Sequence, residues 1–472
     1  MISNELTISA IRSGIAEQED ADSHNRNTLR TLLSGDLNFH DERSQPSAHG
    51  FHSFPAKFPP KLPRTFIDSL TLAGEIVLDP MMGSGTTVLE AYLSGRKGIG
   101  FDVDPLAILL SKAKLTTLDT AEVDQFSRRI IDEARSSCAN RQEILLSALQ
   151  AKWDLKTLQF VNYWFLKDVQ VQLLALSNEI EKIPDNALRT FFQVALSGTI
   201  ITKTGGVSLA LDLAHTRPHR AKILSTESGP VLLDRRNHVN QNRLRFVTKT
   251  IRSAFDEFRK KVDQNAHTLT LNGTGYHQAR IEVGSADRLP LDDESIDLVV
   301  TSPPYASNAI DYMRAHKFSL VWLGYSIEQL GEHRKKYFGN EKVADNPFEE
   351  LPNHTMKIVE SIRRLDPRKG LVLQRYYSDM MLVIKESRRV LRPGKSAIFV
   401  VGNSIIRGIN IGIQDCFAEM GRSIGLEVVH IGIRNLDRNK RMMPASSRPD
   451  LSSQIQQRMH EEFVIGYYKP RS

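Results

Sequence analysis

Cysteine is nearly absent from this chain, with only Cys138 and Cys416 among 472 residues. Neither residue stands in a metal-ligand spacing, which excludes a disulfide framework and a cysteine-based zinc site, and we expect no metal. Long apolar runs are also missing: none approaches the roughly 20 residues that span a bilayer, and the N-terminus lacks the apolar core of a signal peptide. These absences predict a protein of the reducing cytoplasm with no membrane partner.

The 62 lysines and arginines exceed the 55 acidic residues, which gives a formal net charge of +7. Many soluble proteins share this balance, so the placement of the cations is more informative than their sum. They concentrate between residues 217 and 261, where such a patch can neutralise the phosphates of a nucleic acid. A solvated helix face is the competing interpretation. The arginines that we regard as candidate nucleic-acid contacts are Arg217, Arg220, Arg235, Arg236, Arg243 and Arg245.

Short apolar runs rich in β-branched residues predict β-strands. Helical periodicity at 86–94 and 106–115 links the first strands at the spacing of a βαβ unit, and a further helix at 376–391 should end before Arg392-Pro393-Gly394. The pattern therefore predicts an α/β fold with a seven-stranded sheet. The predicted strands span residues 75–78, 97–101, 280–286, 295–302, 396–403, 426–433 and 462–468.

A long insert separates the second predicted strand from the third. From about 120 to 200, apolar residues recur at three- and four-residue steps, which predicts helices; residues 202–240 resemble loops and 241–262 a basic helix. We therefore divide the chain into a polar N-terminal arm at 1–48, an α/β domain formed by 49–115 and 276–472, and a helical, basic insert at 116–275. A second irregular stretch, 325–372, follows the fourth strand.

The first predicted strand ends near Asp79, where a glycine-rich turn leads into a helix. Gly83 and Gly85 allow a ligand to approach the backbone closely, and the helix from Thr86 offers free N–H groups that suit a carboxylate. Asp79 can bind an ammonium, so the turn matches the zwitterionic end of an amino acid. Asp102, at the tip of the second strand, is placed to accept from ribose hydroxyls. Because neither a full G-x-G-x-x-G nor a Walker lysine is present, S-adenosylmethionine is favoured over a dinucleotide or a triphosphate.

A second motif, Ser302-Pro303-Pro304-Tyr305, follows the fourth predicted strand. It resembles the S/D/N-P-P-Y/F motif of enzymes that methylate amines conjugated to a π-system, and this resemblance implies an exocyclic amine of a base as the target. Such an amine is a poor nucleophile, because its lone pair is delocalised into the ring. The Ser302 hydroxyl and the Pro303 carbonyl can accept from the two N–H bonds of such an amine and localise the lone pair on nitrogen. The two prolines hold the loop rigid, and Tyr305 offers a flat face for a base to stack on. The competing interpretation is an ordinary surface turn.

Both motifs resemble those of a known family. DPMMGSGTT at 79–87 resembles the cofactor motif D-P-F-x-G-S-G-T-T of the DNA amino-methyltransferases, and SPPY at 302–305 resembles the S/D/N-P-P-Y/F motif of enzymes that methylate amines conjugated to a π-system. The resemblance covers roughly residues 49–115 and 280–470. It implies a class I S-adenosylmethionine-dependent methyltransferase with a Rossmann-like seven-stranded sheet and double-stranded DNA as substrate. The insert departs from the family pattern, because it comes before the third strand and not after it. The target base would flip out of the duplex.

Further site residues come from the resemblance alone. Pro80 belongs to the cofactor motif, Asp287 stands where an acidic residue faces the cofactor adenine, and the segment 54–60, with Phe58, resembles one that closes over the methionine end of the cofactor. Residues 402–404 (Gly-Asn-Ser) should line the rim of the target pocket. We favour residues 200–262 as the DNA-reading segment. The alternative is 325–372, with Arg334, Lys335, Lys336, Arg363, Arg364 and Arg368.

The residue before Pro-Pro-Tyr bears on the target base. Serine there is commoner in N4-cytosine enzymes and aspartate in N6-adenine enzymes, so the resemblance favours N4 of cytosine and leaves N6 of adenine open. Two rival classes remain. A methyltransferase of RNA or protein usually has Asn or Asp where Ser302 stands, and a catalytically inactive DNA-binding relative would have a degraded cofactor turn. We find no nuclease or helicase motif in the sequence, so a restriction endonuclease partner would be a separate protein.

Overall fold

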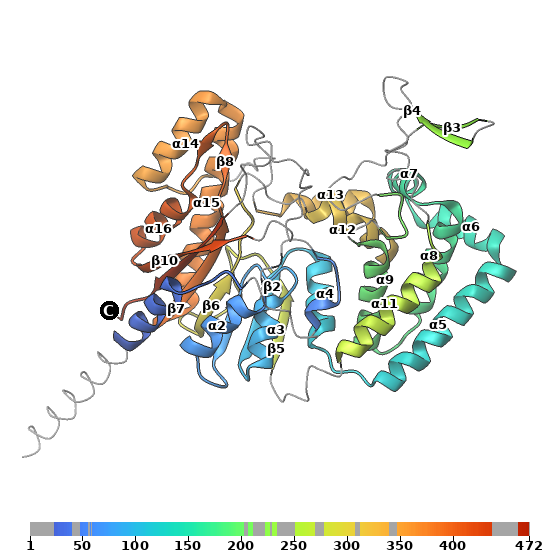
Figure 1. Ribbon diagram of the computed structural model, residues 1–472, viewed down its shortest axis with the longest axis horizontal. Helices are drawn as coiled ribbons and strands as arrows, with labels where there is room; N and C mark the ends of the chain where they lie inside the picture. The colour runs from blue at the N-terminus through green and yellow to red at the C-terminus, as the bar shows by residue number, and fades with distance from the viewer. Residues whose placement is uncertain are drawn as a thin grey trace, which may run out of the picture.

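A computed structural model describes most of the chain. The described residues are 23–39, 48–54, 57, 59–202, 206–210, 222–226, 229–233, 251–269, 278–306, 312–338, 347–436 and 461–471. Within these ranges, no helix combines the length and apolar character that a bilayer-spanning segment needs. Figure 1 shows a sheet flanked by helices on one side of the molecule and a group of further helices on the other.

The sheet has the seven strands that the sequence predicts, in the order β10-β11-β7-β6-β1-β2-β5. All are parallel to one another except β11, which runs antiparallel to both of its neighbours. This order, with β1 inside the sheet between β6 and β2, confirms the Rossmann-like seven-stranded fold. The strands are β1 (Ile76–Asp79), β2 (Lys97–Asp102), β5 (Ala279–Val283), β6 (Ile296–Thr301), β7 (Leu391–Gly402), β10 (Glu427–Asn435) and β11 (Glu461–Tyr468).

Successive residues of the central strands pack on opposite faces of the sheet, as the two-residue period of a strand requires. On β6, Val300 packs with α2 (Lys61–Leu70) and a helix at residues 23–34, whereas Val299 packs with α14 (Asn353–Leu365), α15 (Pro367–Val390) and α16 (Ile413–Ser423). Both faces are therefore covered, which explains why the strand sequences are almost continuously apolar. Helices α3 (Thr86–Leu93) and α4 (Pro105–Leu115) follow β1 and β2.

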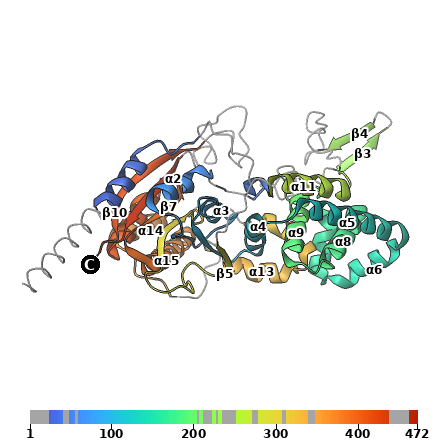
Figure 2. The ribbon, with the colours of Figure 1, turned by 90° about the horizontal axis from the view of Figure 1, so that it is seen from below.

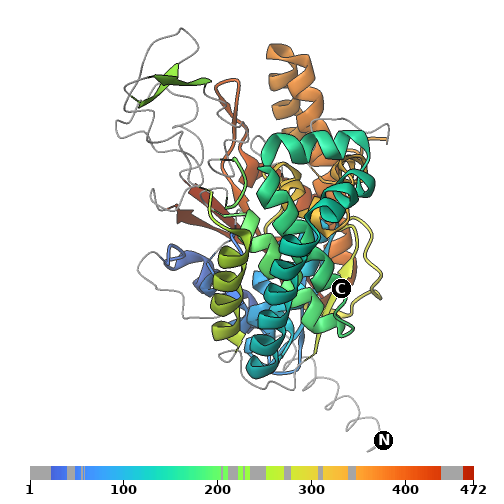
Figure 3. The same cartoon turned by 90° about the vertical axis from the view of Figure 1, so that its right-hand side faces the viewer.

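The insert lies between β2 and β5, as predicted, and forms a helical group whose apolar core also includes residues of α3 and α4 (Figures 1 and 2). Helices α5, α8 and α11 pack side by side (Figure 3), and α4 joins the group to the sheet by packing against α9. Two helices follow the turn formed by the second motif, Ser302–Tyr305, which we call the catalytic turn. These helices, α12 (Tyr312–Leu320) and α13 (Ile327–Lys335), add to the same core. The insert elements are α5 (Thr120–Asn140), α6 (Gln142–Lys152), α7 (Leu155–Trp164), α8 (Lys167–Glu181), α9 (Asn186–Ile200), the hairpin β3 (Lys222–Thr226) and β4 (Gly229–Leu233), and α11 (Ala254–Leu269).

Several boundaries differ from the sequence expectations. Helix α15 begins at Pro367 rather than 376, because Asp366 caps it by accepting from the Lys369 N–H at 3.0 Å. The following strand begins at Leu391, so Pro393 and Gly394 lie inside β7, at a register shift against β6 that accommodates them.

Three other segments are more regular than expected. The hairpin β3–β4 lies in the loop-like 202–240 segment, α13 and α14 lie in the 325–372 stretch expected to be irregular, and part of the polar arm forms the helix at 23–34. Residues 251–253 are not helical, so the described part of the basic helix begins at Ala254 instead of 241.

Candidate active site

The two motif turns lie at the same edge of the sheet. Strands β1 and β6 are hydrogen-bonded neighbours and run parallel, so their carboxyl ends meet there. The Thr301 hydroxyl, one residue before Ser302, donates to Asp79 Oδ1 at 2.8 Å. A direct hydrogen bond therefore joins the first residue of the cofactor motif to the residue that precedes the catalytic turn.

The first motif, residues 79–87, forms a turn between β1 and α3 that we call the cofactor turn. The conformations of its glycines determine its shape. Gly83 and Gly85 have φ of +50° and +73°, in the left-handed region that favours glycine. A side chain at Gly85 would also clash, because its Cβ would lie 2.5 Å from Ser111 Oγ. Helix α3 begins at Thr86, and no side chain caps its N-terminus. The turn therefore directs uncapped backbone N–H groups toward the carboxyl edge, as a carboxylate ligand requires.

Asp79 is a buried carboxylate, only 2% exposed. It accepts from neutral donors, which include Thr301 and the Met81 N–H at 3.2 Å, and it forms no ion pair with any residue that the structure describes. Burial outweighs these hydrogen bonds and raises its pKa to about 6. A buried carboxylate of this kind suits an ammonium ligand, and with the α3 N-terminus it fits the amino-acid end of S-adenosylmethionine. The adjacent Pro80 is buried.

The other two predicted carboxylates are Asp102 and Asp287. Asp102 is the last residue of β2, and Asp287 follows β5, the strand that pairs with β2. Asp102 accepts from the Gly83 N–H at 2.8 Å and the Asp104 N–H at 2.9 Å. Burial and the charge of Asp104 raise the pKa of Asp102 to about 7. Asp287 is half-buried after β5 and accepts from the Ser285 hydroxyl. The structure thus places Asp79, Asp102 and Asp287 in succession along one edge of the sheet.

Helix α4 supports the cofactor turn through two side chains, Lys114 and Ser111, that the sequence analysis did not identify. Lys114 is 1% exposed, and its ammonium donates to the Ser84 carbonyl. Ser111, one helical turn earlier, donates to the Gly83 carbonyl at 3.4 Å. Burial holds the pKa of Lys114 well below its usual value. The three-residue spacing indicates one helix face, but nothing in the sequence shows that this face meets the turn.

An aromatic side chain from the predicted N-terminal closing segment reaches the same turn. A Cβ on Gly83 would lie 3.5 Å from the ring of Phe54, which stacks on Tyr312 with centroids 5.7 Å apart. Phe54 also lies 4.8 Å from the ring of His316, whose Nδ1 lies 2.5 Å from Asp104 Oδ2. This part of the segment therefore contacts the cofactor turn, whereas Phe58 lies outside the described residues.

The catalytic turn presents polar groups at its surface. Ser302, Pro304 and Tyr305 are half-buried and Pro303 is buried. Tyr305 Oη donates to Glu462 Oε1 at 2.7 Å. Burial and this carboxylate raise the pKa of Tyr305 well above its usual value, so the phenol keeps its proton. Of the predicted rim, Gly402 packs against the Tyr305 ring and Ser404 is buried.

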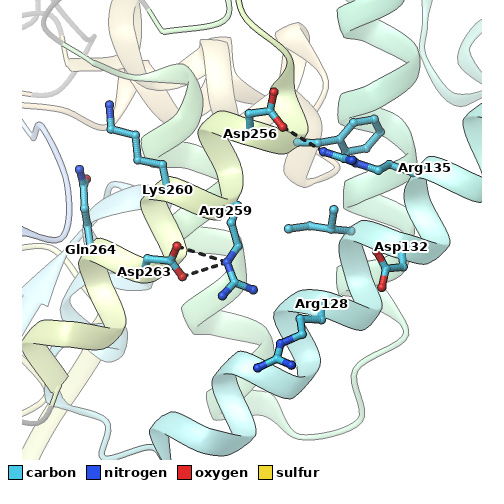
Figure 4. A pocket seen from close by; sticks show the side chains of 10 residues that line it. Arg128, Asp132, Arg135, Asp256, Arg259, Lys260, Asp263 and Gln264 are labelled. Carbon is cyan, nitrogen blue, oxygen red and sulfur yellow. Dashed lines mark hydrogen bonds and ion pairs between the residues drawn. The ribbon is translucent and has the colours of Figure 1, made fainter.

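The basic segment is only partly described. The six candidate DNA-binding arginines, from Arg217 to Arg245, all lie outside the described residues. At its described end, Arg252 pairs with Glu257 at 3.0 Å and Arg259 with Asp124 at 2.7 Å. Figure 4 shows a groove between α5 and α11 where arginines and carboxylates alternate, and Arg135 pairs there with Asp256 at 2.9 Å. Arg135 and Arg259 thus pair with carboxylates on the opposite helix, so these two guanidiniums are not free to bind phosphate.

Comparisons with known proteins connect this architecture to DNA methylation. A family model described as DNA methylase matches residues 16–113. The Type II methyltransferase M.MvaI of Kocuria varians is 25% identical over 453 residues, which cover 91% of this chain and 93% of the relative. M.BsoBI of Geobacillus stearothermophilus, also a Type II methyltransferase, is 22% identical over 440 residues, covering 82% of this chain and 80% of the relative.

Among solved structures, the ribosomal RNA methyltransferase AviRa of Streptomyces viridochromogenes aligns with a TM-score of 0.29 and 10% identity, covering 91% of this chain and 96% of that one. A TM-score this low does not establish a shared fold.

Proposed function

The chain belongs to the S-adenosylmethionine-dependent DNA amino-methyltransferases, and we propose that it methylates the N4 amine of cytosine at specific sites in double-stranded DNA. The observation that carries this proposal is the Thr301–Asp79 hydrogen bond, which fixes the cofactor turn beside the catalytic turn. A cofactor and an amine held at the two turns would share one edge of the sheet.

The cofactor supplies an electrophilic methyl group on a sulfonium. In our proposal, Asp79 holds its ammonium and the N-terminus of α3, after Gly83 and Gly85, holds its carboxylate. Asp102 accepts from the ribose hydroxyls, and Asp287 faces the adenine. Pro80 and Phe54 would pack around these groups, and Lys114 holds the turn through the Ser84 carbonyl.

Ser302 and Pro303 would act on the amine. The Ser302 hydroxyl and the Pro303 carbonyl would accept from its two N–H bonds, which would localise the nitrogen lone pair for attack on the methyl group. As the new N–C bond formed, the bond between sulfur and the methyl carbon would break, S-adenosylhomocysteine would leave, and the methylated nitrogen would then lose one proton to water. Pro304 keeps the loop rigid and Tyr305 stacks on the flipped base. Positioning supplies much of the rate acceleration, because no strong base is needed before attack.

Serine at position 302 favours cytosine N4, and adenine N6 is the alternative, since a hydroxyl accepts from either amine. For DNA contacts, we retain the six arginines between Arg217 and Arg245 as the proposed recognition surface. A second surface is available at the α14–α15 turn, where Arg364 and Arg368 are exposed and form no ion pair with described residues. By analogy with Type II relatives, we place the chain in restriction–modification, with any cognate endonuclease a separate protein.

Tritiated cofactor offered in parallel to DNA, RNA and protein tests the substrate class. We expect label in DNA, and label that appears only in RNA or protein would reject the proposal. Sequencing of host DNA for modified bases, with and without the gene, then identifies the base and the site together. N6-methyladenine in place of N4-methylcytosine would keep the enzyme class and change the base.

A further inference from the structure

A buried histidine on α12 contacts the turn that follows β2. His316 Nδ1 lies 2.5 Å from Asp104 Oδ2, and the two residues are 0% and 4% exposed. Burial alone would raise the pKa of Asp104, but His316 and further hydrogen-bond donors hold that pKa below its ordinary value. Asp104 is therefore ionised and can only accept, so the imidazole donates its Nδ1 proton to the carboxylate.

Asp104 connects this histidine to Asp102, the carboxylate that we propose for the ribose. Asp104 Oδ1 caps α4 by accepting from the Leu106 N–H at 2.8 Å, and the Asp104 backbone N–H donates to Asp102 Oδ1 at 2.9 Å. The Gly83 N–H donates to Asp102 Oδ2 at 2.8 Å, so each oxygen of Asp102 has one backbone donor. The direction in which Asp102 presents its remaining lone pairs thus depends on where the backbone of Asp104 lies.

The imidazole ring itself is held by aromatic neighbours. Its centroid lies 4.8 Å from that of Phe54 and 5.9 Å from that of Tyr312, which stands one helical turn earlier on α12. The other ring nitrogen, Nε2, is buried and has no hydrogen-bond partner among the described residues. The hydrogen bond to Asp104 is thus the polar contact that sets the orientation of the His316 ring.

We propose that His316 is a positioning residue for the cofactor: through Asp104, it holds the Asp102 carboxylate in the orientation that accepts from the ribose hydroxyls of S-adenosylmethionine. This inference rests on the proposed function, because it takes Asp102 to bind the ribose. His316 and Asp104 are 212 residues apart in sequence, and His316 belongs to neither motif. The competing explanation is a tie between α12 and α4 that stabilises the fold and leaves cofactor binding unaffected.

Two substitutions of His316 separate the hydrogen bond from the aromatic packing. Phenylalanine keeps a ring against Phe54 and removes the donor, whereas the amide of asparagine keeps a donor near the position of Nδ1 and removes the ring. Calorimetry on the full-length protein at about pH 8 is suitable, because the pKa of Asp102 is about 7 and the carboxyl is then mostly ionised. We expect His316→Phe to raise the Kd for S-adenosylmethionine by about tenfold, and His316→Asn to stay within about threefold of wild type.

The ribose hydroxyls provide a readout that a general loss of packing would not change. We expect His316→Phe to weaken S-adenosylhomocysteine by about tenfold, but an analogue without the two ribose hydroxyls by less than about twofold, because that analogue no longer uses Asp102. Asp104→Ser gives the same test if His316→Phe does not fold. Serine still caps α4 but lacks the oxygen that His316 binds, so we expect the same loss that depends on the ribose hydroxyls.

Ser319→Ala is the matched control on the same helix. Ser319 is 1% exposed, accepts from the Ser197 hydroxyl at 2.8 Å and donates to the His316 carbonyl at 3.2 Å. Its substitution removes buried hydrogen bonds of α12 but leaves the imidazole on Asp104, so cofactor affinity should not change.

Wild-type affinity in His316→Phe, equal losses for the two homocysteine ligands, or the same loss in His316→Asn or Ser319→Ala would overturn the inference. If the wild-type protein bound both homocysteine ligands equally well, the proposed role of Asp102 and this inference would be overturned together. Wild-type protein that binds S-adenosylmethionine but labels only RNA or protein would overturn the proposed substrate alone, because the calorimetry contains no nucleic acid.

Discussion

The cofactor turn and the catalytic turn share an edge of the sheet but are supported in different ways. The cofactor turn rests on α4, a nearby helix in the chain, through Lys114 and Ser111. The catalytic turn rests on strands that come much later, with Tyr305 packed on Gly402 of β7 and hydrogen-bonded to Glu462 of β11. One site is built from local contacts, and the other depends on the completed sheet.

The difference separates two kinds of defect. A change at the cofactor turn or at α4 should weaken cofactor binding, because Lys114 and Ser111 of α4 donate to the carbonyls of Ser84 and Gly83 in that turn. A change at β7, β10 or β11 should leave cofactor binding intact and slow methyl transfer. The Thr301–Asp79 hydrogen bond is a direct connection between the two turns.

The largest effect should come from removing one central residue on each side. We expect Ser302→Ala to lower kcat by about two orders of magnitude with nearly unchanged cofactor affinity, because it removes an acceptor that acts in the transition state. Asp79→Ala should instead raise the Kd for S-adenosylmethionine by about 10- to 100-fold, because it removes a charge-assisted hydrogen bond to the ammonium. Single-turnover transfer rates and calorimetric binding measure the two effects separately.

The comparison would fail if these effects were exchanged. A Ser302→Ala enzyme that no longer bound the cofactor would indicate that the two turns collapse together. An Asp79→Ala enzyme with normal affinity would place the ammonium elsewhere. Thermal unfolding of each variant distinguishes such results from a general loss of structure.

A smaller effect should appear as a pH dependence on the cofactor side alone. Burial raises the pKa of Asp79 to about 6, so the carboxyl of the free protein is neutral below that pH. An ammonium ligand requires the ionised form. The Kd for S-adenosylmethionine should therefore rise by up to about tenfold for each pH unit below 6. Calorimetry between about pH 5 and 8 measures this slope.

Asp79→Asn should remove the slope, and Asp102→Asn should keep it. The pKa of Asp102 is raised to about 7, but that carboxylate accepts from the neutral N–H groups of Gly83 and Asp104, and in our proposal its cofactor partners are neutral ribose hydroxyls. The ionisation of Asp79 affects folding in the opposite direction: it strengthens cofactor binding but lowers the stability of the free protein. The folded pKa of Asp79 lies above its unfolded value near 3.8, so ionisation disfavours the folded state as pH rises from about 4 to 6. If the pH dependence of the Kd were lost in Asp102→Asn and kept in Asp79→Asn, the ionisation of Asp102 and not that of Asp79 would control cofactor binding.

Local chemistry was predictable from the sequence, and contacts between distant segments were not. A short apolar run rich in β-branched residues predicted a strand at 295–302, and β6 spans Ile296–Thr301. Gly83 and Gly85 were predictable because a tight turn between strand and helix needs left-handed residues. Glu462 gave no signal, because its partner Tyr305 is brought to it only by the register of β7 and β11.

The insert shows the same limit. Its helices could be predicted from their periodicity, but the roles of its cations depend on neighbours from other helices. Arg259 belongs to the basic segment, yet it pairs with Asp124 on α5, far away in sequence. Charge counted along the chain therefore overestimates the charge that is available to a phosphate.

The smallest effect should come from removing exposed cations that could contact the DNA backbone. This prediction compares cations of the catalytic part of the molecule with cations of the insert. Arg364 and Arg368 are exposed at the turn between α14 and α15, without an ion pair among the residues described. If this turn contacts the DNA backbone, a double Arg364→Ala, Arg368→Ala variant should bind DNA a few-fold more weakly at moderate salt, with unchanged kcat. The slope of log K against log salt should become shallower by about 2, since each phosphate contact contributes about 0.9.

The matched control removes two charges from the insert groove instead. Arg135→Ala with Arg259→Ala deletes guanidiniums that already pair with Asp256 and Asp124, so few counterions would be released through them and the salt slope should not change. If the groove variant made the slope of log K against log salt shallower and the α14–α15 variant did not, the DNA backbone would contact the insert and not the α14–α15 turn. Because the two variants have the same net charge, the difference between their slopes depends on where the duplex lies and not on the total charge of the protein.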